Sequence, residues 1–180
     1  IHADVMGPME KTSISGSKYA LVVLDDYSRF SEIVCVASKA DVAPKMVNII
    51  KRWEKQTGKT VKTLRSDGGN EFAGELAKAI RNTGVQHQLT VPYTPQQNGR
   101  AERLNRTLIE KAKAMLFDAK MPKEFWAEAI VTANFVRNAT FTETIKAVPA
   151  ELFYGKEVDV KMFKVFGCLT YDQTPKSKRQ

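Results

Sequence analysis

The sequence contains few of the residues that build zinc-based or disulfide-bonded frameworks. Its 180 residues include two cysteines, Cys35 and Cys168, and two histidines. Each cysteine lies in an apolar run without a Cys-x-x-Cys partner, so neither the spacing of a zinc site nor that of a redox pair is present. We interpret both cysteines as small residues of the core.

Long hydrophobic runs are also missing. No uninterrupted apolar stretch reaches the length of a membrane span, and no signal or transit peptide precedes the first structured-looking residues. Hydrophobic residues still make up 43% of the chain, which is enough for one soluble domain with its own core. Because the sequence opens at Ile1, close to an expected strand end, we expect it to be part of a longer chain.

Acidic residues are outnumbered by basic ones. The chain has 28 Lys and Arg residues against 20 Asp and Glu residues, which gives a formal charge of +8 and a pI near 9.5. This excess favours an acidic partner, and nucleic acid is the polyanion that such surfaces most often meet. The charge alone is weak evidence, because many proteins are basic for other reasons.

Hydrophobic periodicity predicts an α/β fold with a mixed five-stranded sheet flanked by helices. The predicted strands are 1–5, 19–24, 30–36, 60–64 and 85–91, and the predicted helices are 41–55, 71–82, 99–118 and 124–137. A short helical piece in VPAELFYGK and a further strand in VFGCLTYD follow them. The helix at 41–55 is amphipathic and carries a basic outer face with Lys45, Lys51, Arg52 and Lys55.

Three carboxylates occupy related positions in this order of elements. Asp4 leaves the first predicted strand, Asp67 leaves the fourth, and Glu102 lies in the first turn of the helix after the fifth. If the first and fourth strands are neighbours, the two aspartates converge at one edge, and helix packing can bring Glu102 beside them. Each acid also has a simpler explanation, since the aspartates suit the turns that follow them and Glu102 suits the helix dipole.

Such acids would repel one another unless they were protonated or bound to cations. Hard divalent cations such as Mg²⁺ or Mn²⁺ prefer oxygen ligands, and two of them about 3.5 to 4 Å apart can clamp the oxygens of an in-line phosphodiester displacement. That chemistry suits a basic protein. Other acids are assigned to local structure, Asp25 and Asp26 to a turn and Glu71 to the start of a helix.

The phrases around these three acids resemble a known family. Asp4 in IHADVMGPM, Asp67 in LRSDGGNEF and Glu102 in VPYTPQQNGRAERLNR resemble the D, D and E of a retroviral-type integrase core. ALVVLDDYSRF, and PAELFYGK followed by KVFGCLTY, are similar to copia-type long-terminal-repeat retrotransposon polyproteins in particular. The resemblance covers nearly the whole chain. It implies a ribonuclease-H-like fold, an integrase catalytic core at 1–140 and the start of a truncated downstream region at 141–180.

The resemblance also implies an activity, that of a polynucleotidyl transferase that processes the 3′ ends of element DNA and joins them to target DNA. Asp4, Asp67 and Glu102 would be catalytic and would ligate two Mg²⁺ (or Mn²⁺) ions, with Asp4 as the bridging ligand. One ion would lower the pKa of the nucleophile, first water and then a 3′-hydroxyl, and the other would stabilise the leaving oxygen. Six further residues would contact DNA: Tyr93, Gln97, Asn98, Asn105, Arg106 and Lys113.

The implied partners are element and target DNA and further copies of the chain, with no membrane and no small-molecule substrate. The implied location is the nucleus, with a cytoplasmic particle stage. One departure from the family pattern concerns the spacing, because 34 residues separate Asp67 from Glu102, about one fewer than usual. With this shorter spacing, it is open whether Glu102 reaches the two aspartates, and so whether the chain is active.

The zinc-binding and carboxy-terminal DNA-binding regions of full integrases are also missing from the sequence, and we interpret His2 and His87 as structural. A catalytically silent DNA-binding and self-association module derived from an integrase is therefore an alternative. A ribonuclease-H-type enzyme is a third hypothesis, but it explains neither the PQxNG loop nor the VFGC segment.

Overall fold

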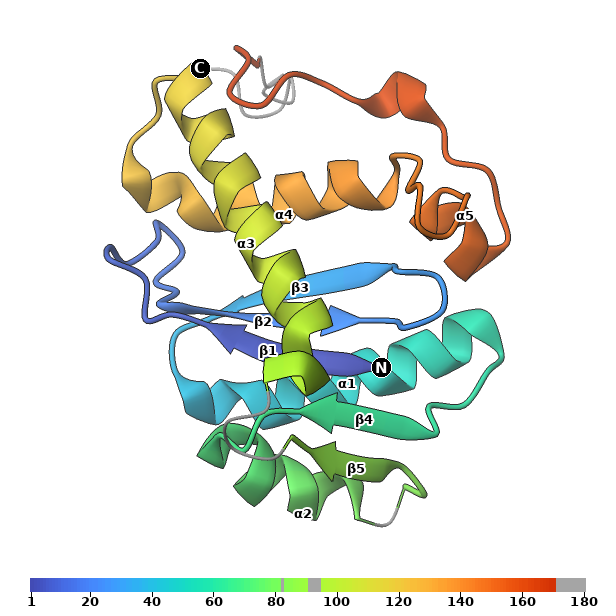
Figure 1. Ribbon diagram of the computed structural model, residues 1–180. Helices are drawn as coiled ribbons and strands as arrows, with labels where there is room; N and C mark the ends of the chain where they lie inside the picture. Colours follow the sequence, from blue (N-terminus) through green and yellow to red (C-terminus); the bar gives the residue numbers. More distant parts are fainter. Residues whose placement is uncertain (82, 91–94, 171–180) are drawn as a thin grey trace, which may run out of the picture.

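The computed structural model describes residues 1–81, 83–90 and 95–170, apart from the side chains of 95–98 and 162. These residues form a five-stranded sheet with helices on both faces (Figure 1). The strands are β1 (His2–Met6), β2 (Tyr19–Leu24), β3 (Ser31–Val36), β4 (Thr63–Ser66) and β5 (Gln86–Leu89), in the spatial order β3-β2-β1-β4-β5. The pairs β1–β2 and β2–β3 are antiparallel, whereas β1–β4 and β4–β5 are parallel. The predicted mixed sheet is confirmed.

The helices follow the predicted order. They are α1 (Val42–Thr57), a π-helical segment η2 (Glu71–Leu76) continued by α2 (Ala77–Ile80), α3 (Pro95–Asp118), α4 (Trp126–Asn138) and α5 (Pro149–Tyr154). Three short 3₁₀ helices are also present: η1 (Lys39–Asp41), η3 (Lys123–Phe125) and η4 (Val160–Met162). Within the described residues, none of these helices combines the length and the apolar character needed to cross a membrane.

Two hydrophobic clusters lie on opposite faces of the sheet. Successive residues of a strand point to opposite sides, so Leu21 and Val23 pack with α1 and η2, whereas Ala20 and Val22 pack with α3 and α4. Figure 1 shows α3 crossing the sheet on the face opposite α1. The side chains of one face are therefore separated from those of the other by the sheet itself.

Two local expectations were wrong. Helix α3 begins at Pro95, four residues before the predicted start at Gly99, because proline is well tolerated in the first turn of a helix. The strand expected in VFGCLTYD is not formed by its described part, residues 165–170. Gly167 there has φ of 77° within a turn, which interrupts an extended chain, and Cys168 is exposed instead of lying in the core.

Candidate active site

The sheet brings the first two carboxylates to the same level on neighbouring strands, although Asp4 lies in the middle of β1 and not at its exit as predicted. Strands β1 and β4 are parallel and adjacent, with His2 paired to Arg65. Asp4 lies two residues further along β1, and Asp67 directly follows the last residue of β4. The neighbouring placement of these strands, on which the sequence argument depended, is confirmed.

Asp4 is the half-buried centre of this group. Its carboxylate accepts hydrogen bonds from the backbone N–H of Val5 (2.9 Å) and from Nδ2 of Asn105 on α3 (2.6 Å). Burial is the main reason why the pKa of Asp4 is raised to about 6, and the negative charges of Asp67 and Glu102 raise it further against the two hydrogen bonds. Asp67 and Glu102 therefore lie close enough to act electrostatically on Asp4.

The position of Glu102 removes its simpler explanation. It is the eighth residue of α3, counted from Pro95, and not a residue of the first turn as the sequence predicted. The helix dipole acts mainly within the first turn, so it does not account for an acid at this depth. The Glu102 side chain is exposed, which leaves its carboxylate free to respond to a cation. Asp67 does serve its turn, since its Oδ1 accepts a hydrogen bond from the N–H of Gly69 (3.1 Å).

The donor atoms at this site suit a hard divalent cation. Asp4, Asp67 and Glu102 offer carboxylate oxygens. Oδ1 of Asn105 is buried and has no hydrogen-bond partner among the described residues, which is rare for a buried polar oxygen. Over residues 1–81, 83–90 and 95–170, however, no three His, Cys, Asp or Glu side chains are gathered closely enough to hold a metal ion. The assignment of these acids as metal ligands therefore stays a prediction.

The residues predicted to contact DNA have different surroundings. Asn105 is only 8% exposed and contacts Asp4, whereas Arg106 and Lys113 are exposed on α3. Tyr93 lies outside the described residues, as do the side chains of Gln97 and Asn98. Asn105 is thus placed as a partner of Asp4, and contacts between these six residues and DNA remain predictions.

Asp26 makes three side-chain contacts that the sequence interpretation missed. Its Oδ1 accepts hydrogen bonds from Nη1 of Arg29 (2.9 Å) and from Nη1 of Arg100 on α3, and it lies 3.1 Å from Nε2 of His2. Asp25 alone plays the predicted turn role, by accepting hydrogen bonds from the N–H and hydroxyl of Ser28. No local sequence signal reveals a contact across 74 residues such as Asp26–Arg100.

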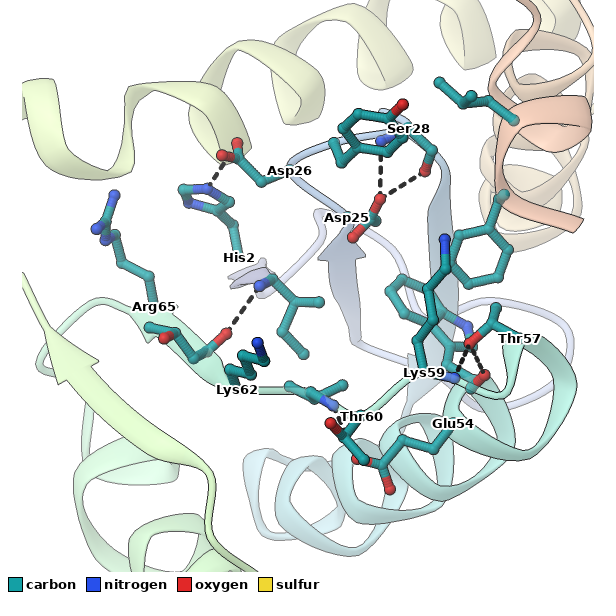
Figure 2. Close-up of a pocket in the computed structure, with 17 residues that line it drawn as sticks. His2, Asp25, Asp26, Ser28, Glu54, Thr57, Lys59, Thr60, Lys62 and Arg65 are labelled. Atoms are coloured by element: carbon teal, nitrogen blue, oxygen red, sulfur yellow. Dashed lines mark hydrogen bonds and ion pairs between the residues drawn. The ribbon is translucent and has the colours of Figure 1, made fainter.

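A separate cavity of about 490 Å³ lies beside the start of β1. Figure 2 shows it between the Asp25–Asp26 turn and the segment that carries Lys59 and Lys62. Asp4, Asp67 and Glu102 do not line it. The two histidines make structural contacts, since His2 faces Asp26 and His87 hydrogen-bonds to the hydroxyl of Ser66 (2.8 Å). Burial lowers the pKa of both rings, that of His2 to about 4.

Several known proteins are similar to the chain. It is 39% identical over 181 residues to the "Retrovirus-related Pol polyprotein from transposon TNT 1-94" of Nicotiana tabacum, which covers 99% of the chain and 14% of the polyprotein. It is 28% identical to the corresponding polyprotein of transposon RE2 from Arabidopsis thaliana, with 88% and 11% covered. The chain thus spans about a seventh or less of the length of these relatives.

Two solved structures share the fold. The catalytic core domain of BIV integrase superposes with a TM-score of 0.62 at 22% identity, over 86% of this chain and 92% of that one. A simian T-cell lymphotropic virus intasome in complex with the PP2A regulatory subunit B56 gamma gives 0.67 at 14% identity, over 97% and 59%. The fold is therefore the ribonuclease-H-like fold of integrase cores.

The family model described as "Integrase core domain" matches residues 1–95. This match covers β1 to β5, including Asp4 and Asp67, and the copia-type polyproteins extend the similarity over the remainder of the chain. The chain therefore belongs to the integrase core domain family, as a retrotransposon integrase core.

Proposed function

We propose that this integrase core is a polynucleotidyl transferase that cleaves and joins DNA phosphodiesters with two divalent cations, Mg²⁺ or Mn²⁺. It would process the 3′ ends of element DNA and transfer them into target DNA. The observation that carries the proposal is geometric: Asp4 and Asp67 lie level on adjacent parallel strands, and Asn105 of α3 donates a hydrogen bond to Asp4. Burial, together with repulsion by the charges of Asp67 and Glu102, raises the pKa of Asp4. A cation would remove this repulsion and stabilise the ionised acids.

Each residue would have a distinct task. Asp4, Asp67 and Glu102 would hold the cations, with Asp4 shared between them, and Asn105 would orient the Asp4 carboxylate through its 2.6 Å hydrogen bond. When bound, two divalent cations activate the attacking oxygen and stabilise the leaving oxygen of an in-line displacement. The chain needs no nucleophile of its own, and the half-buried Cys35 would be a poor one, since partial burial raises its pKa to about 12.

The partners would be the ends of element DNA, target DNA and further copies of the chain. The formal charge of +8 and the family support DNA as the partner, and the neighbour described as an intasome supports assembly. The proposed DNA contacts include Arg106 and Lys113, the exposed basic residues of the predicted set on α3. The proposed location is the nucleus, after a cytoplasmic particle stage.

Substitution of the second acid tests the proposed chemistry. In the full-length integrase, Asp67→Asn should abolish strand transfer supported by Mg²⁺ or Mn²⁺. Glu75→Gln is the matched control, because the Glu75 side chain is 76% exposed and forms its ion pair with Lys78; this variant should keep wild-type activity. Strand transfer by Asp67→Asn at the wild-type rate would refute the assignment.

The alternative is a catalytically silent module that binds DNA and self-associates. It is favoured by the spacing of 34 residues between Asp67 and Glu102, and by the finding that no three His, Cys, Asp or Glu side chains of the described residues are gathered closely enough to hold a metal ion. A calorimetric titration with Mn²⁺ distinguishes the two functions. An active core should bind Mn²⁺ and lose this binding in Asp67→Asn, whereas a silent module would bind duplex DNA with a steep salt dependence but no Mn²⁺.

A further inference from the structure

Most of the net charge of this chain is concentrated in one short segment. Residues 45–65 contain seven Lys and Arg residues and a single acid, Glu54, so this segment contributes +6 of the formal +8. The segment comprises most of α1 and the connection to β4. The charge excess is therefore concentrated in one segment, and the residues assigned to catalysis and DNA contact above do not include its lysines.

The lysines of α1 lie opposite its buried face. Met46, Ile49, Ile50 and Trp53 are buried against the sheet, whereas Lys45, Lys51 and Lys55 are exposed. At 100° per residue these three lysines occupy an arc of about 120°, and they extend over about 15 Å of the helix axis. Exposed Lys59 and Lys62 follow on the connection from α1 to β4, where they line the cavity beside β1. We call these five residues the α1 stripe: Lys45, Lys51, Lys55, Lys59 and Lys62.

Neighbouring acids do not neutralise the α1 stripe. Among the described residues, no carboxylate oxygen lies within 4.0 Å of any of its five ammonium groups. Glu54 accepts a hydrogen bond from the N–H of Val61 (2.8 Å), and Glu32 pairs with Arg52 and Trp53. Like charges four residues apart, as in Lys51 and Lys55, destabilise an isolated helix. A row of like charges that nearby acids do not neutralise suits a polyanionic partner.

The α1 stripe and the catalytic acids lie on different sides of the sheet. Asp4 contacts Asn105 on α3, whereas α1 packs against the other face through residues that include Leu21, Val23 and Leu64. Figure 1 shows α1 and α3 on these opposite faces. Figure 2 shows Lys59 and Lys62 on the connection that leads from α1 back to the sheet. A duplex bound to the α1 stripe would therefore contact a different face of the molecule from DNA bound near the catalytic acids.

We propose that the α1 stripe is a second DNA-binding surface, which holds the sugar–phosphate backbone of duplex DNA without reading its sequence. The choice of DNA over other polyanions rests on the proposed function. A duplex carries one charge per about 1.7 Å of its axis with both strands counted, so a length of about 15 Å, that of the α1 lysines, carries about nine phosphates, of which those on the near side can meet the stripe. Lysine ammonium groups on flexible stems bind phosphates as point charges, without a base-specific geometry. The DNA bound here is a different stretch from the one at Asp4, Asp67 and Glu102.

Two variants with equal loss of charge test this surface. The stripe variant replaces Lys45, Lys51, Lys55 and Lys59 with glutamine. The control variant replaces four other exposed lysines with glutamine: Lys18, Lys156, Lys161 and Lys164. Glutamine and lysine have similar helix propensities, and circular dichroism checks that both variants fold. Fluorescence anisotropy then measures the affinity for a labelled duplex between about 50 and 200 mM salt.

The stripe variant should bind at least tenfold more weakly at low salt, and its slope of log affinity against log salt should be smaller by about 3 to 4. The control variant should keep the wild-type slope, and a variant with arginine at the four stripe positions should keep both slope and affinity. Equal losses in the stripe and control variants would overturn the inference, because net charge alone would then explain binding.

The result also separates this inference from the proposed function. A stripe variant that binds DNA like the wild type would overturn the α1 surface alone, provided that Asp67→Asn still abolishes strand transfer. A wild-type chain that does not bind duplex DNA at low salt would overturn both. Unchanged binding of DNA by Asp67→Asn, together with the loss in the stripe variant, would support two independent surfaces.

Discussion

Replacement of Asn138, whose side-chain amide is buried between α4 and the sheet, should measurably lower the stability of the fold. Asn138 is 6% exposed, and its Oδ1 accepts a hydrogen bond from the N–H of Ser31 (3.0 Å), while its Nδ2 donates one to the carbonyl of Ser31 (2.7 Å). Ser31 begins β3, an outer strand of the sheet. In Asn138→Ala the Ser31 carbonyl keeps the hydrogen bond from Asn134 (2.8 Å), but the N–H loses this partner.

A buried N–H left without a partner costs about 1 to 3 kcal/mol. We therefore expect Asn138→Ala to lower the free energy of unfolding by about 2 kcal/mol and the Tm by about 4 to 8 °C, as measured by urea and thermal unfolding. Asn138→Leu, which keeps the branched shape and the number of side-chain heavy atoms, should lose a similar amount. Val131→Ala is the control on the same helix, since Val131 is 45% exposed, and it should change stability by less than about 0.5 kcal/mol.

A small effect would refute this reasoning. If Asn138→Ala lost less than about 0.5 kcal/mol, the Ser31 N–H would have found water or another acceptor, and the amide would not hold α4 to the sheet. If Asn138→Leu kept wild-type stability while Asn138→Ala did not, the loss would come from the cavity and not from the hydrogen bonds.

Three further measurements test the electrostatics of the fold. Asp26→Asn should cost less than about 1 kcal/mol in urea unfolding, because the Asp26 side chain is 50% exposed, and a larger loss would contradict this. Burial lowers the pKa of His2 from 6.5 to about 4 and raises that of Asp4 from 3.8 to about 6. As the pH falls through this window, the unfolded chain binds a proton at His2 that the folded chain excludes, which destabilises the fold, whereas folded Asp4 binds its proton first, which stabilises it. Metal-free Asp4→Asn should therefore lose about 2 kcal/mol between pH 7 and pH 4 that the wild type retains; parallel urea-unfolding profiles of the two would contradict this. Burial also raises the pKa of Cys35 to about 12, so about one thiol in 10⁴ is ionised at pH 8, and iodoacetamide should label Cys35 only in urea, as followed by mass spectrometry. Labelling in native buffer as fast as that of an exposed thiol would refute the burial.

The sequence predicted the order of the elements well, because apolar residues recur along each with its own period. The continuous apolar run in Tyr19–Leu24 and the helical spacing in Val42–Thr57 mark nearly the same spans in the structure. Boundaries were less accurate, since Pro95 is compatible with either a loop or the first turn of a helix. The expected strand after Val165 failed at Gly167, whose positive φ suits a turn.

The sequence was sufficient to predict the acids of the candidate site, but not the burial and hydrogen bonds of those acids. The motifs around Asp4, Asp67 and Glu102 identify these residues directly, whereas the hydrogen bond from Asn105 to Asp4 joins positions 101 residues apart. Asn105 was predicted to contact DNA, and its burial against Asp4 depends on how α3 crosses the sheet. Side-chain pairing at that distance leaves no periodic signal in the sequence.

The sequence by itself determined the family motifs, the order of strands and helices, and the basic face of α1, because each depends on residue identity and local spacing. The tertiary structure alone decided that β1 lies beside β4, that Asp4 is half buried, and that Asp26 ties Arg100 of α3 to the sheet. The physical reason is that pKa shifts and buried hydrogen bonds arise from desolvation by groups distant in sequence. Packing brings those groups together, and only the packed chain shows which acids share one environment.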